Sequence, residues 1–135
     1  MKKFLMTLLG ILFLVTAQEA FAQRLTNSSN NGVGKIESDG TIRNSSGNSI
    51  GKIDSSGYIR NASGNSIGRI ESDGVVRNSS GNRVGKVASD GTVENSSGNR
   101  IGTVRGGTVR NASGNTIGYY SGVKDAWAAI FFFFW

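Results

Sequence analysis

A five-residue motif, Asn-Ser/Ala-Ser-Gly-Asn, recurs along the middle of the chain and constrains the fold more than any other feature. Its copies begin at Asn44, Asn61, Asn78, Asn95 and Asn111, and a degenerate copy begins at Asn27. Successive copies are 17 residues apart, except for a last step of 16, and a turn of the Ser-Asp-Gly type lies between them. Self-similarity at a fixed period indicates a repeat architecture, in which each unit contains two short strands and two turns.

Glycine has to supply most of the turns, because the chain has 20 Gly and no Pro. In the Ser-Asp-Gly loops, glycine suits the left-handed position that follows a type I turn in a three-residue hairpin. In the other motif, the Gly-Asn pair predicts a two-residue hairpin turn, which needs positive φ. Strands of about five residues joined by such turns form an antiparallel meander, so the fold class is all-β.

The turn positions set the strand register, and the register sorts the side chains onto two faces. A turn at the Gly-Asn pair of the first full repeat would place Ile42 opposite Ile53. Arg43 and Lys52 would also face each other. The Ser-Asp-Gly loop before it places Ile36 opposite Ile42. Because side chains alternate along a strand, one face is wholly apolar and is expected to point inward: Ile36, Ile42, Ile53, Ile59, Ile70, Val76, Val87, Val93, Val104, Val109 and Tyr120.

The opposite face gathers most of the basic residues of the repeats. We call these residues the basic belt: Lys35, Arg43, Lys52, Arg60, Arg69, Arg77, Lys86 and Arg110. Such a belt suits anionic lipid headgroups, lipopolysaccharide phosphates or acidic envelope polymers, through contacts that salt weakens. The alternative is a solvated face that keeps a barrel soluble. An exposed apolar ring is expected beside the belt, as in proteins that bind membrane surfaces: Ile50, Ile67, Val84, Ile101 and Ile117.

A sheet with one apolar face can bury it by closing into a barrel, which also removes the edge strands. Five full repeats with flanking half-units predict ten to twelve strands, and a barrel of that width leaves a lumen that Ile and Val cannot fill. The last ten residues, 126–135, are all apolar and are expected to plug this lumen. The predicted plug side chains are Trp127, Ile130, Phe131, Phe132, Phe133, Phe134 and Trp135.

The plug is expected to be a helix rather than a strand, because four consecutive Phe have no amphipathic period and suit a helix buried on all sides. Asp125 is expected to cap this helix. The glycines of the inward face are expected either to admit close approach of the plug or to mark strand bulges. These glycines are Gly34, Gly51, Gly68 and Gly85.

The first 22 residues have the pattern of a secretory signal peptide. Lys2 and Lys3 precede an apolar run, and Ala20 and Ala22 form a small-x-small cleavage site. The alternative, an uncleaved anchor, needs a span of ~20 apolar residues, and this run is shorter. We therefore expect a bacterial protein exported to the periplasm or the exterior, with no transmembrane span after cleavage. The expected divisions are a signal peptide at 1–22, a repeat barrel at 23–121 and a hydrophobic plug of the same domain at 122–135.

Tandem Gly-Lys-Ile-Glu-Ser-Asp-Gly-Thr-Ile-Arg-Asn-Ser-Ser-Gly-Asn units, followed by Ala-Ala-Ile-Phe-Phe-Phe-Phe, resemble the bacterial beta-flower family of five-fold beta-flower proteins over residues 24–135. The resemblance implies a shallow symmetric barrel of radiating hairpins. Its shape is similar to the tubby C-terminal domain, a closed barrel around a central hydrophobic helix, whose family binds phosphoinositide headgroups through a basic surface. No tubby binding motif stands in this sequence, so the resemblance implies a fold and no activity. The degenerate copy at 27–31 adds a sixth unit to the five-fold count.

Composition excludes several kinds of active site. The chain has no His and no Cys, which removes Ser-His triads, thiolate nucleophiles, disulfides and zinc sites of the usual type. A catalytic pair of carboxylates needs two acids in one cleft, whereas the repeat spreads Glu37, Asp54 and Glu71 around a ring. No enzyme activity, cofactor or metal site is therefore expected. The six Asn-x-Ser sequons are interpreted as turn residues rather than as glycosylation sites.

The sequence favours an exported, non-enzymatic binding or structural module that contacts anionic membrane or envelope surfaces through the basic belt. The alternative is a protein- or glycan-binding module that uses the Ser- and Asn-rich turns at the rims. Nucleic acid is a poor partner for an exported protein, and no row of aromatic residues for base stacking lies on the basic face. The sequence leaves the oligomeric state open.

Overall fold

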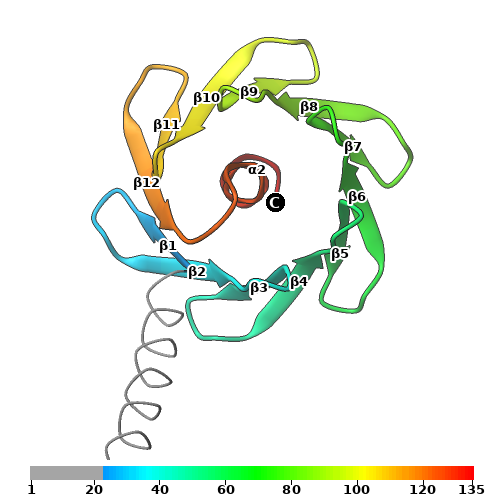
Figure 1. The fold of residues 1–135 in the computed structure, drawn as a ribbon, viewed down its shortest axis with the longest axis horizontal. Helices are drawn as coiled ribbons and strands as arrows, with labels where there is room; N and C mark the ends of the chain where they lie inside the picture. The colour runs from blue at the N-terminus through cyan, green and yellow to red at the C-terminus, as the bar shows by residue number, and fades with distance from the viewer. Residues whose placement is uncertain (1–22) are drawn as a thin grey trace, which may run out of the picture.

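The computed structural model describes residues 23–135, so the predicted signal peptide at 1–22 lies outside the described residues. Twelve antiparallel strands form one closed barrel, in which consecutive strands pair and β1 also pairs with β12 (Figure 1). This confirms the predicted fold class. The strands are β1 (Arg24–Asn27), β2 (Gly32–Ile36), β3 (Thr41–Asn44), β4 (Ser49–Ile53), β5 (Tyr58–Asn61), β6 (Ser66–Ile70), β7 (Val75–Asn78), β8 (Arg83–Val87), β9 (Thr92–Asn95), β10 (Arg100–Arg105), β11 (Thr108–Asn111) and β12 (Thr116–Ser121).

The inward face of the barrel is the apolar face that strand alternation predicted. Across the Ser-Asp-Gly loop, Ile36 lies opposite Ile42, and Lys35 opposite Arg43 on the other face, as expected. The predicted inward residues are buried, except for Ile70, which is half-buried. Each fully buried Val or Ile side chain contributes about 1.5–3 kcal/mol, so this face is the main source of stability in the sheet.

The register across the Asn-Ser-Ser-Gly-Asn turn differs from the prediction. Asn44 pairs with Asn48 around a three-residue Ser-Ser-Gly loop whose glycine has a φ of 86°, so the turn is not a two-residue Gly-Asn turn. A β-bulge follows the loop, and Ile42 lies opposite Gly51 instead of Ile53. The net difference is two residues. Because side chains alternate with period two, a shift of two leaves the residues outside the bulge on their predicted faces.

The same shift separates the cations that the sequence placed opposite each other. Arg43 lies opposite Ser49, and Lys52 lies opposite Thr41. The turns at the other copies of the Asn-Ser/Ala-Ser-Gly-Asn motif show the same shift, for example with Arg60 opposite Ser66. Three of these hairpins therefore place Ser49, Ser66 or Thr116 across from their arginine, whereas the third full repeat places Arg83 opposite Arg77.

The asparagine that opens each turn organises the loop through its side chain. Oδ1 of Asn44 accepts hydrogen bonds from the backbone N–H groups of Ser46 and Asn48, both at 3.0 Å. The same two bonds recur at the other copies of the motif, including the degenerate copy at Asn27. A short side-chain acceptor that folds back onto its own loop is the usual reason for Asn in turns, which supports the interpretation of the sequons as turn residues.

The predicted ring of exposed apolar residues beside the belt is wrong in most of its members. Ile50, Val84, Ile101 and Ile117 are half-buried and pack against the core, and only Ile67 of this set is exposed. The cause is the β-bulge after each Asn turn, which falls at these positions and turns the side chains toward the end of the lumen.

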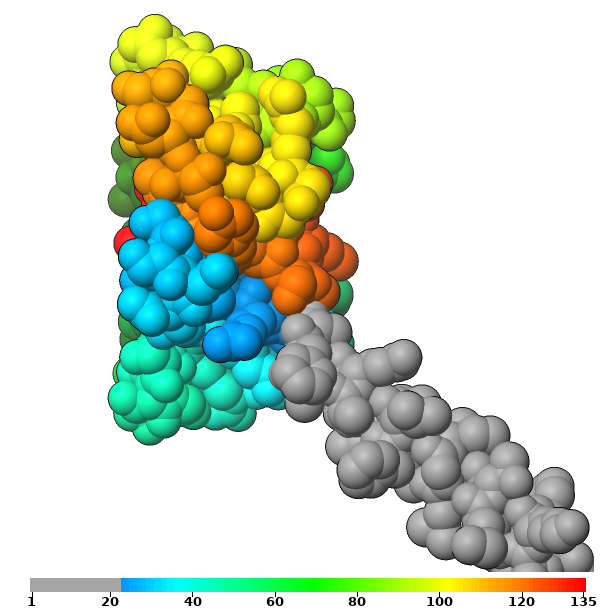
Figure 2. Space-filling view, turned by 90° about the vertical axis from the view of Figure 1, so that its left-hand side faces the viewer, coloured from blue at the N-terminus to red at the C-terminus, as the bar shows by residue number. Residues whose placement is uncertain are grey.

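A helix fills the lumen, as predicted for the plug. It consists of α2 (Asp125–Ala129) followed by the π-helix η1 (Ile130–Phe134), and α2 contacts β10. Ala128, Ala129 and Ile130 are fully buried on the barrel axis. Figure 2 shows the ring side-on as a thick disc, in which the turn before the helix reaches one flat side and the C-terminal residues reach the other.

The predicted cap of this helix is wrong. Lys124, not Asp125, is the N-cap residue, and no side chain caps the first turn. Asp125 lies one position inside the helix, where a carboxylate is favourable to the helix dipole. Its side chain instead accepts a hydrogen bond from Tyr120 of β12.

Candidate functional site

The basic belt lies on the outward face of β2–β8 and β11, but part of its charge is already paired. Arg43 forms an ion pair with Glu37, Arg60 with Asp54 at 3.3 Å, and Arg77 with Glu71. In each case the acid directly follows one strand, and the arginine lies on the next strand across the Ser-Asp-Gly-type turn, six residues later. These half-exposed pairs contribute about 0–1 kcal/mol each, so their main effect is on local charge.

The same arginines also hold the turns at the other end of their strands. Nη1 of Arg43 donates to the carbonyl oxygen of Gly47 at 3.0 Å, and Arg60, Arg77 and Arg110 make the equivalent bond to their own turns. An arginine that is fixed by a carboxylate and by a turn carbonyl has few donors left for a ligand. The paired arginines of the belt are therefore structural.

In the fourth repeat the acid and the arginine are absent together. Where the first three repeats have Glu37, Asp54 and Glu71, this repeat has Ala88, and six residues later it has Glu94 in place of an arginine. Glu94 lies opposite Lys86 and forms its ion pair with Arg83 at 3.7 Å. Sequence reasoning missed these pairs, although the recurring six-residue spacing of acid and arginine was a signal for them.

Five belt residues form no ion pair within residues 23–135: Lys35, Lys52, Arg69, Lys86 and Arg110. Lys35, Lys52 and Arg69 lie in successive repeats, each beside a paired arginine on the next strand. Like charges directly opposite each other in a sheet are destabilising, and the carboxylates relieve this repulsion for one member of each pair only. One cation of each pair is therefore left without a counter-charge.

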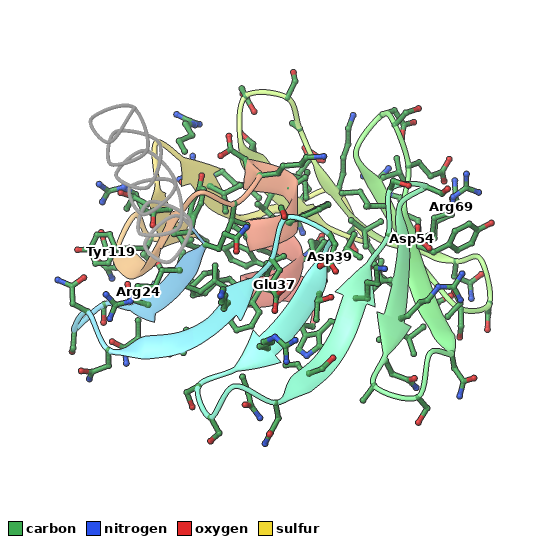
Figure 3. All side chains as sticks on the ribbon, turned by 60° about the horizontal axis from the view of Figure 1, so that its bottom comes forward. Arg24, Glu37, Asp39, Asp54, Arg69 and Tyr119 are labelled. Atoms are coloured by element: carbon green, nitrogen blue, oxygen red, sulfur yellow. The ribbon has the colours of Figure 1, made fainter. Side chains whose placement is uncertain are left out.

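Three of the five unpaired belt cations lie in successive repeats on one side of the ring, and Lys86 and Arg110 lie on the other. Beyond β7, Lys86 lies opposite Glu94, and Thr103 takes the place of a cation opposite Arg110. On the first side, Arg24 of β1 lies opposite Lys35. We call Arg24, Lys35, Lys52 and Arg69 the cationic arc. Figure 3 shows its two ends, with Arg24 near Tyr119 and with Arg69 farther round the ring.

Arg24 is a member of this site that sequence reasoning missed. It lies 17 residues before Thr41, so the repeat period extended by one unit could have placed it on the outward face. Together with Lys35 and Arg43, it lines a surface hollow of about 220 Å³ that also includes turn residues Asn44 and Ser45. Arg43 is already paired with Glu37, so Arg24 and Lys35 are the two charges that this hollow offers to an anionic group.

Arg69 differs from the lysines of the arc because it stacks on an aromatic ring. Its guanidinium carbon lies 5.2 Å from the ring centroid of Tyr58, and that of Arg60 lies 5.6 Å from the same ring. Tyr58 itself is 38% exposed. Such cation–π contacts orient an arginine and leave its N–H groups free to bind an anion.

The turn carboxylates lie on the side of the ring where the helix enters. Glu37, Asp39 and Asp54 follow one another along this side (Figure 3). The pKa of Asp39 is held below its usual value of 3.8, because the backbone N–H of Thr41 donates to its side chain, and Thr92 acts in the same way on Asp90. Among residues 23–135, no three His, Cys, Asp or Glu side chains gather as metal ligands.

The aromatic tail forms a rosette at the end of the lumen nearest the Asn turns. Each ring lies over the inward glycine of one hairpin, where a Cβ atom would collide with it: Phe131 over Gly34, Phe132 over Gly118, Phe133 over Gly102, Phe134 over Gly85 and Trp135 over Gly51. At Gly34, a Cβ would lie 2.9 Å from Cζ of Phe131. These contacts support the expectation that the inward glycines admit close approach of the plug. β-Bulges also adjoin the same glycines, so the second expectation holds as well. The rings are half-buried, and Trp135 is 41% exposed.

Trp127 lies at the opposite end of the plug from the rosette. It is half-buried against the core, and Nζ of Lys124 lies 4.8 Å from its ring centroid. Together with Lys124 it borders a hollow beside the β4–β5 and β6–β7 turns. Trp127 therefore closes the entrance of the lumen rather than filling its middle.

A family model described as 5-fold beta-flower protein matches residues 22–135. The chain belongs to the beta-flower family. No curated protein and no solved structure matches it. This beta-flower barrel has six hairpins, because the degenerate copy at 27–31 forms a hairpin of β1 and β2. Five aromatic rings face these six hairpins. Within residues 23–135 of this beta-flower protein, no helix is both long and apolar enough to span a bilayer.

Proposed function

We propose that this beta-flower protein is an exported, non-enzymatic binding module that attaches to anionic membrane or envelope surfaces through the cationic arc. The observation that carries the proposal is the uneven pairing of the basic belt. Glu37, Asp54 and Glu71 neutralise one cation in each of three hairpins and leave Lys35, Lys52 and Arg69 on the same arc of the surface.

The geometry of the arc favours an extended anionic surface over a single small ion. Its cations come from consecutive hairpins, so they follow the outside of the ring rather than converging on one pocket. Each basic residue near an anionic membrane surface contributes about 1 kcal/mol to binding. Four such residues suit weak, reversible and salt-sensitive attachment.

The test is co-sedimentation of the mature chain with vesicles of phosphatidylglycerol and phosphatidylcholine, compared with vesicles of phosphatidylcholine alone. Lys35→Glu with Lys52→Glu is expected to weaken binding to the anionic vesicles by more than about tenfold. The matched control is Arg100→Glu with Arg105→Glu, which gives the same net charge but alters exposed residues of β10, outside the arc. This control is expected to lose much less binding.

Two results contradict the proposal. Equal, negligible binding to both kinds of vesicle excludes an anionic surface as the target. An equal loss in the arc variant and in the control means that net charge, and not the arc, decides binding. Raising the salt concentration should weaken the attachment of the unmodified chain, because exposed charges are screened beyond a Debye length of about 8 Å at 0.15 M.

A second candidate function is glycan or protein binding through the Asn turns. The observation that favours it is their uniformity, since six exposed loops share one hydrogen-bonding pattern around the ring. Repeated identical loops suit a polymer with a repeated unit, because several weak contacts then act together. A glycan array separates the candidates, since binding to neutral glycans at high salt does not depend on the cationic arc.

A further inference from the structure

One hairpin of the barrel lacks the aromatic ring that its equivalents have. Five of the six inward glycines lie under a ring of the rosette, and the exception is Gly68 of β6. Among the described residues, the nearest side-chain atom to a Cβ built on Gly68 is Cδ1 of Ile59, at 3.8 Å. The sixth position of the rosette is therefore vacant.

The tail has five rings for six hairpins, so one hairpin is left without a ring. In an α-helix, residues four apart lie only about 40° apart around the axis, which is less than the spacing of neighbouring hairpins. The π-helix η1 has wider turns, with i→i+5 bonds, and the side chains of Phe131 and Trp135 point at neighbouring hairpins, over Gly34 and Gly51. The four Phe of η1 and Trp135, which follows it, thus cover five hairpins and leave one without a ring.

The vacancy is an open, mostly apolar hollow of about 270 Å³, which Arg77 and Asn78 also line. Ile59, Ile67, Val76 and Val84 contribute its walls, and Phe134 and Trp135 border it from the rosette. Ile67 is 42% exposed, whereas the residues at its position in the other repeats are half-buried. An apolar cavity of about 150 Å³ already accommodates benzene, so this hollow is large enough for one aromatic ring.

We propose that this hollow, the Gly68 slot, binds the aromatic ring of a small molecule, such as a phenyl or indole group. The fold itself provides the argument, because the five equivalent positions are each covered by a flat ring seated over a glycine. The slot has the same glycine, the same bulge beside it and apolar walls. Its occupant completes the rosette by contacting the exposed edge of Ile67 and the neighbouring rings. This proposal does not depend on the cationic arc.

The test uses NMR spectroscopy of the methyl-labelled mature chain, titrated with toluene and, separately, with methylcyclohexane. Toluene is expected to bind saturably and to give nuclear Overhauser contacts with the methyl groups of Ile67 and Val84. Methylcyclohexane has a similar size but a puckered ring, and is expected to bind several-fold more weakly. Ile67→Phe is expected to fill the slot and abolish toluene binding. Ile101→Phe is the matched control, because its hairpin already has a ring, that of Phe133, and it should leave binding intact.

Several results would overturn the proposal. They are the absence of saturable binding, contacts with methyl groups elsewhere, equal binding of both probes, or equal loss of binding in the two variants. A dimer that dissociates on Ile67→Phe substitution would mean that a second copy of the chain fills the slot, which also contradicts a small-molecule site. The Overhauser contacts of the unmodified chain keep the test decisive even if the filled variant is unstable.

Discussion

The hydroxyl group of Tyr120 donates a 2.7 Å hydrogen bond to Oδ1 of Asp125. Tyr120 lies on the last strand of the barrel and is only 6% exposed, and Asp125 is the first residue of the plug helix. Between them, the chain turns through 122–124 and enters the lumen. The bond therefore fixes the point at which the helix leaves the wall of the barrel.

Removal of this bond is expected to destabilise the folded chain. Tyr120→Phe should lower the free energy of unfolding by about 1.5–3 kcal/mol, the usual contribution of a hydrogen bond to a charged group. Asp125→Asn should cost less, because an amide oxygen can still accept the bond. Chemical denaturation of both single variants and of the double variant measures the coupling. Additive effects of the two substitutions would show that the bond contributes nothing.

The same pair predicts loss of stability at alkaline pH. The pKa of Tyr120 is raised above its usual value of 10.0, mainly because the phenol is buried and also because Asp125 accepts its proton in a hydrogen bond. The folded state therefore keeps a proton that the unfolded chain releases near pH 10. The contribution of Tyr120 is complete below about pH 10 and is lost as the pH rises above it. Tyr120→Phe should make unfolding less dependent on pH in this range, and an unchanged dependence would contradict the assignment.

The contact between the rosette and the inward glycines predicts a difference between two glycine-to-alanine variants. A Cβ at Gly85 would collide with the carbonyl oxygen of Glu94 and would lie 2.5 Å from Cζ of Phe134. At Gly68, the collision is with the carbonyl oxygen of Arg77 alone, at 2.7 Å. Gly85→Ala should therefore cost about 1–3 kcal/mol more than Gly68→Ala. Equal losses in thermal unfolding would mean that the rings do not press on the barrel wall.

The plug is expected to be indispensable to the fold. Deletion of residues 126–135 removes Ala128, Ala129 and Ile130, which are fully buried, together with the whole rosette. Each lost aromatic or aliphatic side chain contributes about 1.5–3 kcal/mol, so the shortened chain should show no cooperative thermal transition. Deletion of Trp135 alone is the control and should preserve the transition, because this residue is 41% exposed. A cooperative transition in the chain without 126–135 would contradict the role of the plug.

The acids that pair with the belt are expected to restrain attachment to anionic surfaces. Glu37→Gln, Asp54→Asn and Glu71→Gln together release three arginines of the belt. Anionic vesicles should then bind more tightly by at least about tenfold, at about 1 kcal/mol per basic residue. The control removes equal charge from the turns, with Asp39→Asn, Asp73→Asn and Asp90→Asn. Equal gains in vesicle binding for both sets would show that position on the ring does not matter.

The faces of the sheet could be predicted from the sequence, although the register could not be predicted in full. Alternation alone assigns Ile42 and Ile53 to the interior, and an error of an even number of residues does not change that assignment. The error arose at the Asn turn. There the side chain of Asn44 and two backbone bonds close a three-residue loop, and the bulge that follows depends on packing inside the lumen. Turn composition alone does not contain that information.

The helical plug was predictable, but its form was not. A run of apolar residues without a period indicates burial on all sides. The change from α2 to the π-helix η1 follows from the shape of the lumen, because the rings have to reach different hairpins within one turn. For the site, residue type identified the basic belt, whereas the ion pairs that divide it depend on which strands lie side by side. Arg24 was missed because the repeat was not extended to the first strand.

The bond between Tyr120 and Asp125 also bears on the mismatch between the six hairpins of the barrel and the five rings of its plug. The barrel has six hairpins and the rosette has five rings. Rotation of the plug by one hairpin would therefore recreate nearly the same contacts, with the vacancy moved to another glycine. The near-identity of the repeats makes such settings close in energy. The hydrogen bond between Tyr120 and Asp125 selects one of these orientations of the plug. The rotation of the plug is thus fixed at the start of the helix, on the opposite side of the disc from the Gly68 slot. The same bond decides which hairpin is left without a ring.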